Sequence, residues 1–226
     1  MYWYPYVNTV REGTRSRSRA YELVVLGEGM KKVEPDVAIA TIGIISEGQD
    51  LEQIQEQNSE TSERVIQALS NLSISEKNIR TVEYRVEQMY DFIDGKRVFR
   101  GYEVRHLLEV EVEGIKRIGT VVDQAIKSGA NIIYNIRFDY SKRDFVYQEA
   151  LSFALKDATK KAETLAKSMG VNLSRIPFSI QETGTERDVR PFQPMVLSQD
   201  SSSTPIQAGQ LEIKASLIAK FAYMNL

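Results

Sequence analysis

The chain has 226 residues and a formal net charge of -2, and its hydrophobic and charged fractions, 42% and 27%, are ordinary for a folded protein. This charge balance gives no reason to expect nucleic acid or an anionic membrane as a partner. The absence of cysteine excludes disulfides, thiol catalysis and cysteine-ligated zinc, and no stretch reaches the roughly 18 to 20 apolar residues of a transmembrane helix.

Residues 1–20 are expected to form a disordered extension, because this segment offers too little apolar surface to bury. Its aromatic residues come first and its arginines follow, which is the reverse of the order in a secretory signal peptide. Unless translation starts further upstream, we therefore expect a cytoplasmic protein. The aromatic tip, with Trp3 and Tyr4, is a candidate contact with another subunit.

Two apolar runs, Tyr21–Leu26 and Val33–Ile45, predict the first two strands. The second run is apolar on both faces, which is typical of a strand buried on both sides. Gly27 and Gly29 lie between the runs and predict a turn. A dinucleotide-binding loop is the weaker reading, because it needs a third glycine and a following helix.

Asp50, followed by Gln53, predicts the start of a helix that runs to about Leu72. Asn58 and Thr61 fall in the middle of its apolar stripe, and a buried polar side chain needs a hydrogen-bond partner. Either the stripe is only partly covered there, or Asn58 binds the backbone of a strand. We favour the second interpretation.

Residues 80–112 carry apolar side chains at even-numbered positions on both sides of Asp94-Gly95, which predicts a long β-hairpin. A two-residue loop would set the apolar face of one strand beside the polar face of the other. We therefore predict a three-residue loop that begins at Ile93, with a type I turn and Gly95 in the left-handed region. This loop sets two cross-strand pairs, Gln88 with Arg100 and Tyr84 with Val104.

A shorter helix is predicted over 114–128 and an alternating strand over 132–140, and a long helix follows over 141–169. The apolar stripe of the long helix consists of Leu151, Leu155, Ala158, Ala162, Leu165 and Met169. Ser141 and Asp144 predict a capping box at its start, and Gly170 predicts a left-handed stop. Because the stripe is rich in alanine, the surface that it covers can approach closely.

The remaining strands are predicted over Ile176–Gln181 and Leu211–Tyr223, and the last strand is expected to pair with the first strands. Between them, residues 183–206 are rich in proline and serine and predict a long flexible loop. An exposed apolar segment of this loop is a candidate latch on a neighbouring subunit. Its candidate contacts are Phe192, Met195, Val196 and Leu197.

The element order is therefore β-β-α-β-β-α-β-α-β-β, an α+β fold in which three helices pack on an antiparallel or mixed sheet over residues 21–226. Several local patterns occur in this order: Gly27-x-Gly29 with Pro35-Asp36, Asn58, Ile79-x-Thr81-x-x-Tyr84, Gly101-Tyr102, Gly129-Ala130-Asn131, and Ala158-x-x-Lys161-Ala162 ending at Gly170. As an ordered set they resemble the SIMPL domain family, which includes YggE-like and periplasmic immunogenic proteins.

The resemblance implies an α+β protein without an established catalytic site. Several members of the family look like self-assembling rings or channel-like oligomers, and some are linked to stress tolerance or to the cell envelope. Most bacterial members carry a signal peptide, and residues 1–20 of this sequence depart from that pattern.

No familiar catalytic pattern occurs, whether a P-loop, Gly-x-Ser-x-Gly or His-Glu-x-x-His. His106 is the only histidine, and it falls in mid-strand among apolar residues, so we interpret it as structural. Glu109, Glu111 and Glu113 alternate along one strand face. A solvated face is favoured over a cation site there, and the facing strand can carry arginines. We expect no enzymatic activity, cofactor or metal.

Two hypotheses for function remain open. The first is a non-enzymatic assembly protein whose strands and arms build a homo-oligomer. The second is a monomeric or dimeric binding module for a protein or a small ligand. Assembly predicts a large mass that does not depend on concentration, whereas a small-ligand module predicts a pocket with convergent polar groups.

Overall fold

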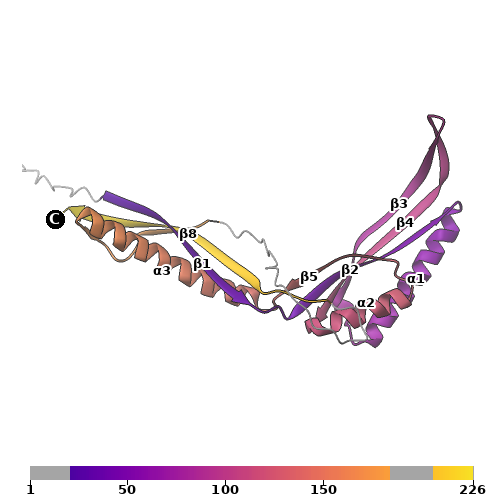
Figure 1. Cartoon of the computed structure of the whole chain (residues 1–226), viewed down its shortest axis with the longest axis horizontal. Coiled ribbons are helices and arrows are strands. Elements are labelled where there is room, and N and C mark those ends of the chain that lie inside the picture. Colours follow the sequence, from indigo (N-terminus) through magenta and orange to yellow (C-terminus); the bar gives the residue numbers. More distant parts are fainter. Residues whose placement is uncertain (1–20, 184–205, 226) are drawn as a thin grey trace, which may run out of the picture.

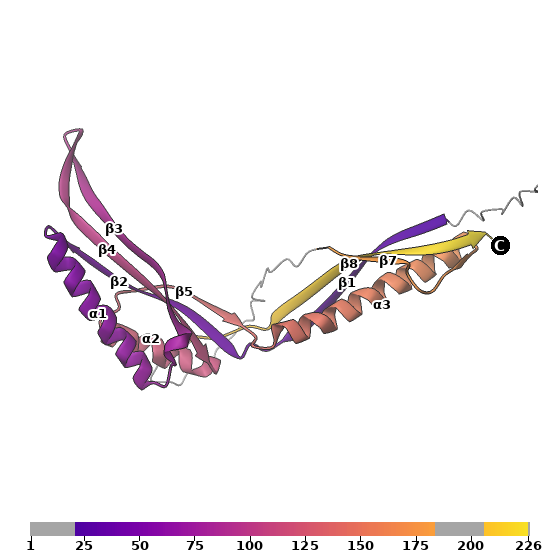
Figure 2. The same ribbon diagram turned by 180° about the vertical axis from the view of Figure 1, so that it is seen from behind.

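The computed structural model describes residues 21–183 and 206–225, which form two layered lobes along the long axis of an elongated molecule (Figures 1 and 2). The first, the α3 lobe, contains β1 (Tyr21–Val33), α3 (Arg143–Met169), β6 (Val171–Leu173), β7 (Ser179–Glu182) and β8 (Leu211–Asn225). The second, the hairpin lobe, contains β2 (Val37–Gly48), α1 (Leu51–Asn71), β3 (Ile79–Ile93), β4 (Lys96–Glu113), α2 (Ile118–Lys127) and β5 (Ile132–Asp139), with single 3-10 turns at Glu76–Asn78 and Ile115–Arg117.

Each lobe contains one antiparallel sheet. The strand order is β1-β8-β6 in the α3 lobe, where β7 also pairs with β8, and β3-β4-β2-β5 in the hairpin lobe. The predicted α+β class is confirmed. The helices divide between two sheets, with α3 on one and α1 and α2 on the other. The short β6 was not predicted, because three residues are too few to show an alternation of apolar and polar side chains.

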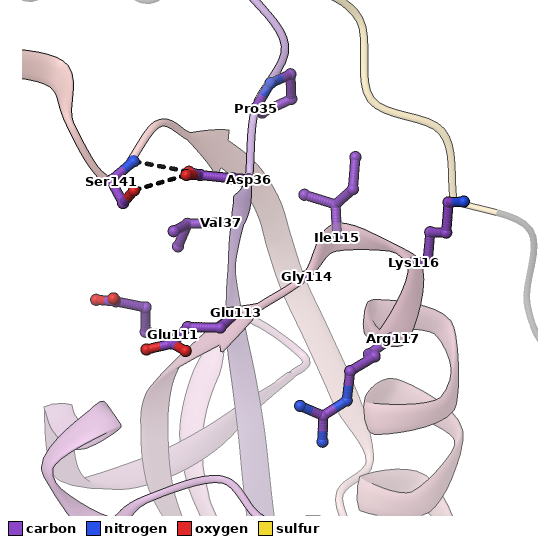
Figure 3. Close-up of a pocket in the computed structure, with 10 residues that line it drawn as sticks. All are labelled: Pro35, Asp36, Val37, Glu111, Glu113, Gly114, Ile115, Lys116, Arg117 and Ser141. Atoms are coloured by element: carbon purple, nitrogen blue, oxygen red, sulfur yellow. Dashed lines mark hydrogen bonds between the residues drawn. The ribbon is translucent and has the colours of Figure 1, made fainter.

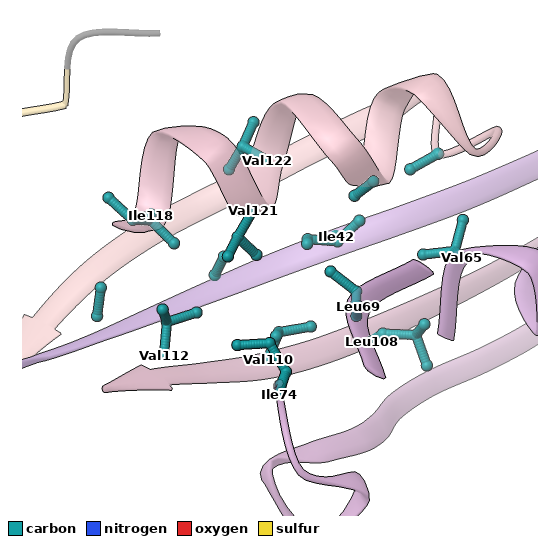
Figure 4. Close-up of a cluster of buried hydrophobic side chains, with 14 of the residues drawn as sticks. Ile42, Val65, Leu69, Ile74, Leu108, Val110, Val112, Ile118, Val121 and Val122 are labelled. Atoms are coloured by element: carbon teal, nitrogen blue, oxygen red, sulfur yellow. The ribbon is translucent and has the colours of Figure 1, made fainter. Parts of the chain in front are cut away.

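The core of the hairpin lobe lies between the sheet and the helices α1 and α2 (Figure 4). As predicted, β2 is buried on both faces, since eight consecutive residues from Val37 to Ile44 are buried. Ile42 contributes to the helix-covered face, where Val65 and Leu69 come from α1 and Val121 from α2. Strand β2 is therefore the fixed centre of this lobe.

Asn58 ties α1 to two strands, as the sequence predicts. Its amide nitrogen lies 3.1 Å from the carbonyl oxygen of Ile44 and 3.3 Å from that of Val104, and the side chain is fully buried. The predicted helix start is also confirmed, because the carboxylate of Asp50 accepts a hydrogen bond from the backbone N–H of Gln53. These bonds fix both the position and the rotation of α1 over the sheet.

The contact face of α3 differs from the predicted stripe. The buried side chains recur every four residues, at Val146, Ala150, Ala154, Ala158, Ala162 and Ala166. Leu165 and Met169 are 43% and 49% exposed, so this end of the predicted stripe is wrong. The predicted capping box is also wrong, because Ser141 binds Asp36 instead of a helix N–H. The left-handed stop at Gly170 is confirmed by its φ of 67°.

Gly27 and Gly29 do not form the predicted turn, but lie within β1 and face α3. A Cβ atom on Gly27 would lie 2.1 Å from the carbonyl oxygen of Ala154, and one on Gly29 would lie 2.0 Å from that of Ala150. Two strand residues advance about 6.8 Å and four helix residues about 6 Å. Glycines two apart therefore match alanines four apart, and the helix rests on the strand backbone.

The other predicted elements are confirmed with local changes. Strand β8 pairs with β1 along its whole length, from Tyr21 with Tyr223 to Val33 with Leu211. In β5 the alternation is interrupted by a register shift, and Tyr134 is 63% exposed instead of facing the core.

We predict that Gly27→Val destabilises the protein by about 1–3 kcal/mol, because the added methyl groups force α3 away from β1. Urea denaturation followed by far-UV circular dichroism measures the free energy of unfolding. Glu28→Ala is the matched control at the next residue, an exposed position, and should change stability by less than about 0.5 kcal/mol. A Gly27→Val protein as stable as the wild type would contradict the close contact.

Candidate functional site

The most prominent surface feature is the end of the β3–β4 hairpin, which projects beyond β2 and α1 (Figures 1 and 2). Strand β2 pairs with β4 only as far as Tyr102. Among the described strands, residues 96–99 and Gly101 of β4 therefore pair only with β3. We call residues 89–101 the hairpin arm.

The arm exposes large apolar side chains on both of its faces. Phe92 is 78% exposed, Ile93 55%, Phe99 46% and Val98 44%. Tyr90 and Phe99 meet edge to face with ring centroids 5.8 Å apart, and the guanidinium of Arg97 lies 3.7 Å from the centroid of the Tyr90 ring. These contacts order one face of the arm and leave its apolar area open to solvent.

The turn of the arm differs from the predicted three-residue loop. Ile93 pairs with Lys96 across a two-residue turn, in which Asp94 and Gly95 have φ angles of 50° and 76°. Both central residues have positive φ, as in the type I′ turn that Asp-Gly favours. The predicted three-residue loop is therefore wrong.

The register of the hairpin is set by a bulge at Arg100. Met89 pairs with Gly101 and Tyr90 with Phe99, so that Arg100 has no cross-strand partner. The two predicted pairs are wrong as a result, and the observed pairs are Gln88 with Tyr102 and Tyr84 with His106. Even-numbered residues still face one another there, because the bulge at Arg100 shifts the register by one residue. The sequence prediction had placed this one-residue shift in the turn.

Arg100 and Gly101 fix the arm to the end of β2. The guanidinium of Arg100 lies 2.6 Å from the carboxylate of Glu47 and 4.0 Å from that of Asp91. A Cβ atom on Gly101 would lie 2.5 Å from the carbonyl oxygen of Gly48, so only glycine lets β4 pass β2 this closely. The arm therefore starts from a fixed base.

The predicted glutamate row on β4 meets arginines from the strands around it. Glu109 binds Arg80 of β3 at 2.8 Å and Arg137 of β5 at 2.9 Å. Desolvation alone would raise the pKa of Glu109, but the hydrogen bonds from Arg137 and Arg80 outweigh it and lower the pKa. This carboxylate is therefore used to join three strands.

His106 bridges α1 and β3. Its Nδ1 lies 2.9 Å from the hydroxyl of Ser62, and its Nε2 lies 3.0 Å from that of Thr81. The Ser62 hydroxyl donates to the carbonyl oxygen of Asn58, so it accepts from Nδ1–H, and Nε2 accepts from Thr81. The ring is then neutral and cannot take a proton from Ser62, which agrees with the structural role assigned from the sequence.

A shallow pocket of about 690 Å³ lies where the two lobes meet (Figure 3). Glu111, Glu113 and Lys116 line it from the hairpin lobe. At its other side, Asp36 accepts hydrogen bonds from the backbone N–H and the hydroxyl of Ser141, at 2.7 and 2.6 Å. Desolvation would raise the pKa of Asp36, but these bonds from Ser141 outweigh it and lower the pKa. Asp36 therefore fastens the start of α3 to β2.

All six residues predicted as subunit contacts lie outside the described residues: Trp3, Tyr4, Phe192, Met195, Val196 and Leu197. Neither the N-terminal segment nor the loop between Thr183 and Ile206 is therefore tested as a contact. The hairpin arm was not predicted as a contact, because its alternation is the same whether or not another surface covers it.

Known proteins resemble this chain along nearly all of its length. A family model described as SIMPL, a protein of unknown function (DUF541), matches residues 23–221. The 26 kDa periplasmic immunogenic protein of Brucella melitensis is 26% identical, over 88% of this chain and 83% of the relative. The uncharacterized protein YggE of Escherichia coli is 24% identical, over 86% of this chain and 78% of the relative. None of these names describes an enzymatic activity.

The expected cytoplasmic location is wrong, because the relatives from Brucella melitensis and Brucella abortus are both named periplasmic. The expectation used only residues 1–20, whereas the likeness to these proteins is carried by the folded part of the chain. In the described part of the chain, no helix is both long and apolar enough to cross a membrane.

We predict that His106 titrates below its ordinary pKa of 6.5, because burial disfavours the charged ring. The unfolded chain then binds the proton more readily, so stability holds above about pH 6.5 and falls as the pH is lowered through 6.5 toward the folded pKa. Nuclear magnetic resonance of the only histidine gives the folded pKa without ambiguity.

Denaturation between pH 5 and 8 tests the same prediction through stability. His106→Gln should remove the part of the pH dependence that lies near pH 6.5, because no imidazole remains to be protonated. A folded pKa at or above 6.5 would contradict the prediction.

Proposed function

The chain belongs to the SIMPL family, and on this premise we propose that it is a non-enzymatic, self-assembling structural protein of the bacterial periplasm. The observation that carries the proposal is the hairpin arm, which holds large apolar side chains in solvent beyond the core. Exposed apolar patches of this kind mark contacts between proteins. The periplasmic location rests on the names of the relatives.

The composition of the arm favours a protein partner. Aromatic residues and arginine are enriched at protein interfaces, and the arm places Phe92, Phe99 and Arg97 together. Asp91 and Asp94 lie among them, so the arm lacks the single sign of charge that nucleic acid or an anionic membrane requires.

A second copy of this chain fits the arm as partner, because the arm is one part of an extended free edge. Among the strands that the structure describes, β3 pairs only with β4, and Tyr84 and Val86 are 53% and 38% exposed along it. Arms of two copies can pair edge to edge, as exposed strand edges do. The candidate contacts Trp3, Tyr4, Phe192, Met195, Val196 and Leu197 belong to the same proposal as further contacts.

We expect the wild-type protein to form an oligomer whose mass, measured by light scattering after size exclusion, is a multiple of 25.7 kDa. Phe92→Ser with Phe99→Ser should shift the distribution toward the monomer by at least about tenfold in the association constant. Ile126→Ser with Phe145→Ser removes two similarly exposed apolar side chains far from the arm and should leave the mass unchanged.

Deletion of residues 184–205 tests the loop contacts in the same measurement. An oligomer that dissociates in this variant alone would assign the assembly to the loop instead of the arm. A wild-type protein that stays monomeric at all concentrations would refute the assembly function.

The pocket between the lobes favours a second function, that of a binding module. Its lining combines Ile115 and Val37 with the charged Glu111 and Lys116, a mixture that suits a small polar ligand. A screen of small polar molecules by thermal shift tests it, with Lys116→Ala as the variant that should lose the shift. This module becomes the favoured function if the wild-type chain is monomeric and a ligand is found.

A further inference from the structure

Strand β1 has a free edge that runs along the α3 lobe. Among the described strands, β1 pairs only with β8. Val24, Leu26 and Met30 are 49%, 47% and 45% exposed on the sheet face that α3 does not cover. A long, apolar free edge of this kind is a template for pairing with another chain, and folded proteins usually block it.

Two side chains of α3 reach around this edge at Gly27. The carboxylate of Asp157 lies 3.0 Å from the backbone nitrogen of Glu28 and accepts its hydrogen bond. The ammonium of Lys161 lies 2.9 Å from the carbonyl oxygen of Leu26 and donates to it. The two side chains are themselves paired at 2.6 Å.

This arrangement copies the hydrogen bonds of one residue in a parallel strand. Such a residue, placed opposite Gly27, would donate its N–H to the carbonyl of Leu26 and accept from the N–H of Glu28 with its carbonyl. Lys161 supplies the donor and Asp157 the acceptor. The pair therefore occupies the hydrogen-bonding positions that an incoming strand needs.

The position of this pair follows from the contact between α3 and β1. Gly27 lets the helix approach until a Cβ atom there would lie 2.7 Å from that of Ala158. Asp157 and Lys161 flank Ala158 on the helix, at the spacing of four residues that suits an ion pair. The hydrogen bonds from Lys161 and from the Glu28 N–H lower the pKa of Asp157, so the carboxylate stays charged at neutral pH.

We propose that the Asp157–Lys161 pair is an autoinhibitory cap that stops β1 from adding a strand of a second copy of this chain. The cap rests on the proposed self-assembly in one respect, since it keeps the edge of β1 out of the contacts between copies. The edge it protects is a latent site for a second copy, because an added strand would bond to the backbone of β1 and its side chains would lie beside Val24, Leu26 and Met30.

The test compares the wild-type chain with Asp157→Ala plus Lys161→Ala. Sedimentation velocity over a range of concentrations should show species heavier than the wild-type protein, with an association constant raised by at least about tenfold. Hydrogen exchange in β1 should slow as the concentration rises, because the new contact forms on its backbone. A variant with the wild-type mass, and with faster exchange at every concentration, would overturn the proposal and leave the pair as a local stabiliser.

Lys160→Ala with Glu163→Ala is the matched control, because it removes the same charges from exposed positions of the same helix. It should behave as the wild type. Adding Glu28→Pro to the capless variant removes the outward N–H and should abolish the heavier species, since proline is tolerated at a free edge. Heavier species that persist with Glu28→Pro would also overturn the proposal.

The capless variant is checked by circular dichroism. If it does not fold, the single variant Lys161→Ala, which keeps the bond from Glu28 to Asp157, is measured in its place, and a wild-type mass would then refute the cap. The mass of the wild-type chain decides the proposed assembly, whereas the difference between variant and wild type decides the cap. The proposed assembly and the proposed cap can therefore be refuted independently.

Discussion

The architecture of the α3 lobe depends on the approach of one helix to a strand backbone. At Gly27 and Gly29 the face of β1 that meets α3 has no side chains, and the alanines of α3 fill that space. Helix and strand are then close enough for Asp157 and Lys161 to bind the backbone of β1. The close approach of α3 to β1 therefore decides how the lobe packs, where the helix lies on the sheet and how the free edge of β1 is capped.

In the hairpin lobe, buried contacts fix the strands from which the hairpin arm projects. Strand β2 is buried on both faces, Asn58 joins α1 to two strands, and Glu109 joins three strands through arginines. The amide nitrogen of Asn58 bonds to two strands and the carboxylate of Glu109 bonds to arginines of two others, and such shared bonds fix one arrangement of the strands. The arm can therefore present apolar side chains at a defined position instead of folding back on the core.

Features that one element decides alone were predictable from the sequence, such as the two-sided burial of β2, the cap at Asp50 and the alternation of β8. Gly27 was misread because its partner, Ala154, lies more than a hundred residues away and a local rule assigns Gly-x-Gly to a turn. The bulge at Arg100 was missed because it serves a contact with Glu47. The candidate site was least predictable, since alternation marks a strand face but does not say whether anything covers it.

The pairing of β1 with β8 has a consequence for the order of folding. Tyr21 pairs with Tyr223, whereas the strands of the hairpin lobe all lie between Val37 and Asp139. Closing a long chain segment costs conformational entropy, and pairings between distant residues form slowly. The hairpin lobe can therefore fold while the chain is still incomplete, and the α3 lobe closes only when β8 arrives. A chain that is cut short before β8 loses its α3 lobe as a unit, so a folded α3 lobe requires that both β1 and β8 have been made.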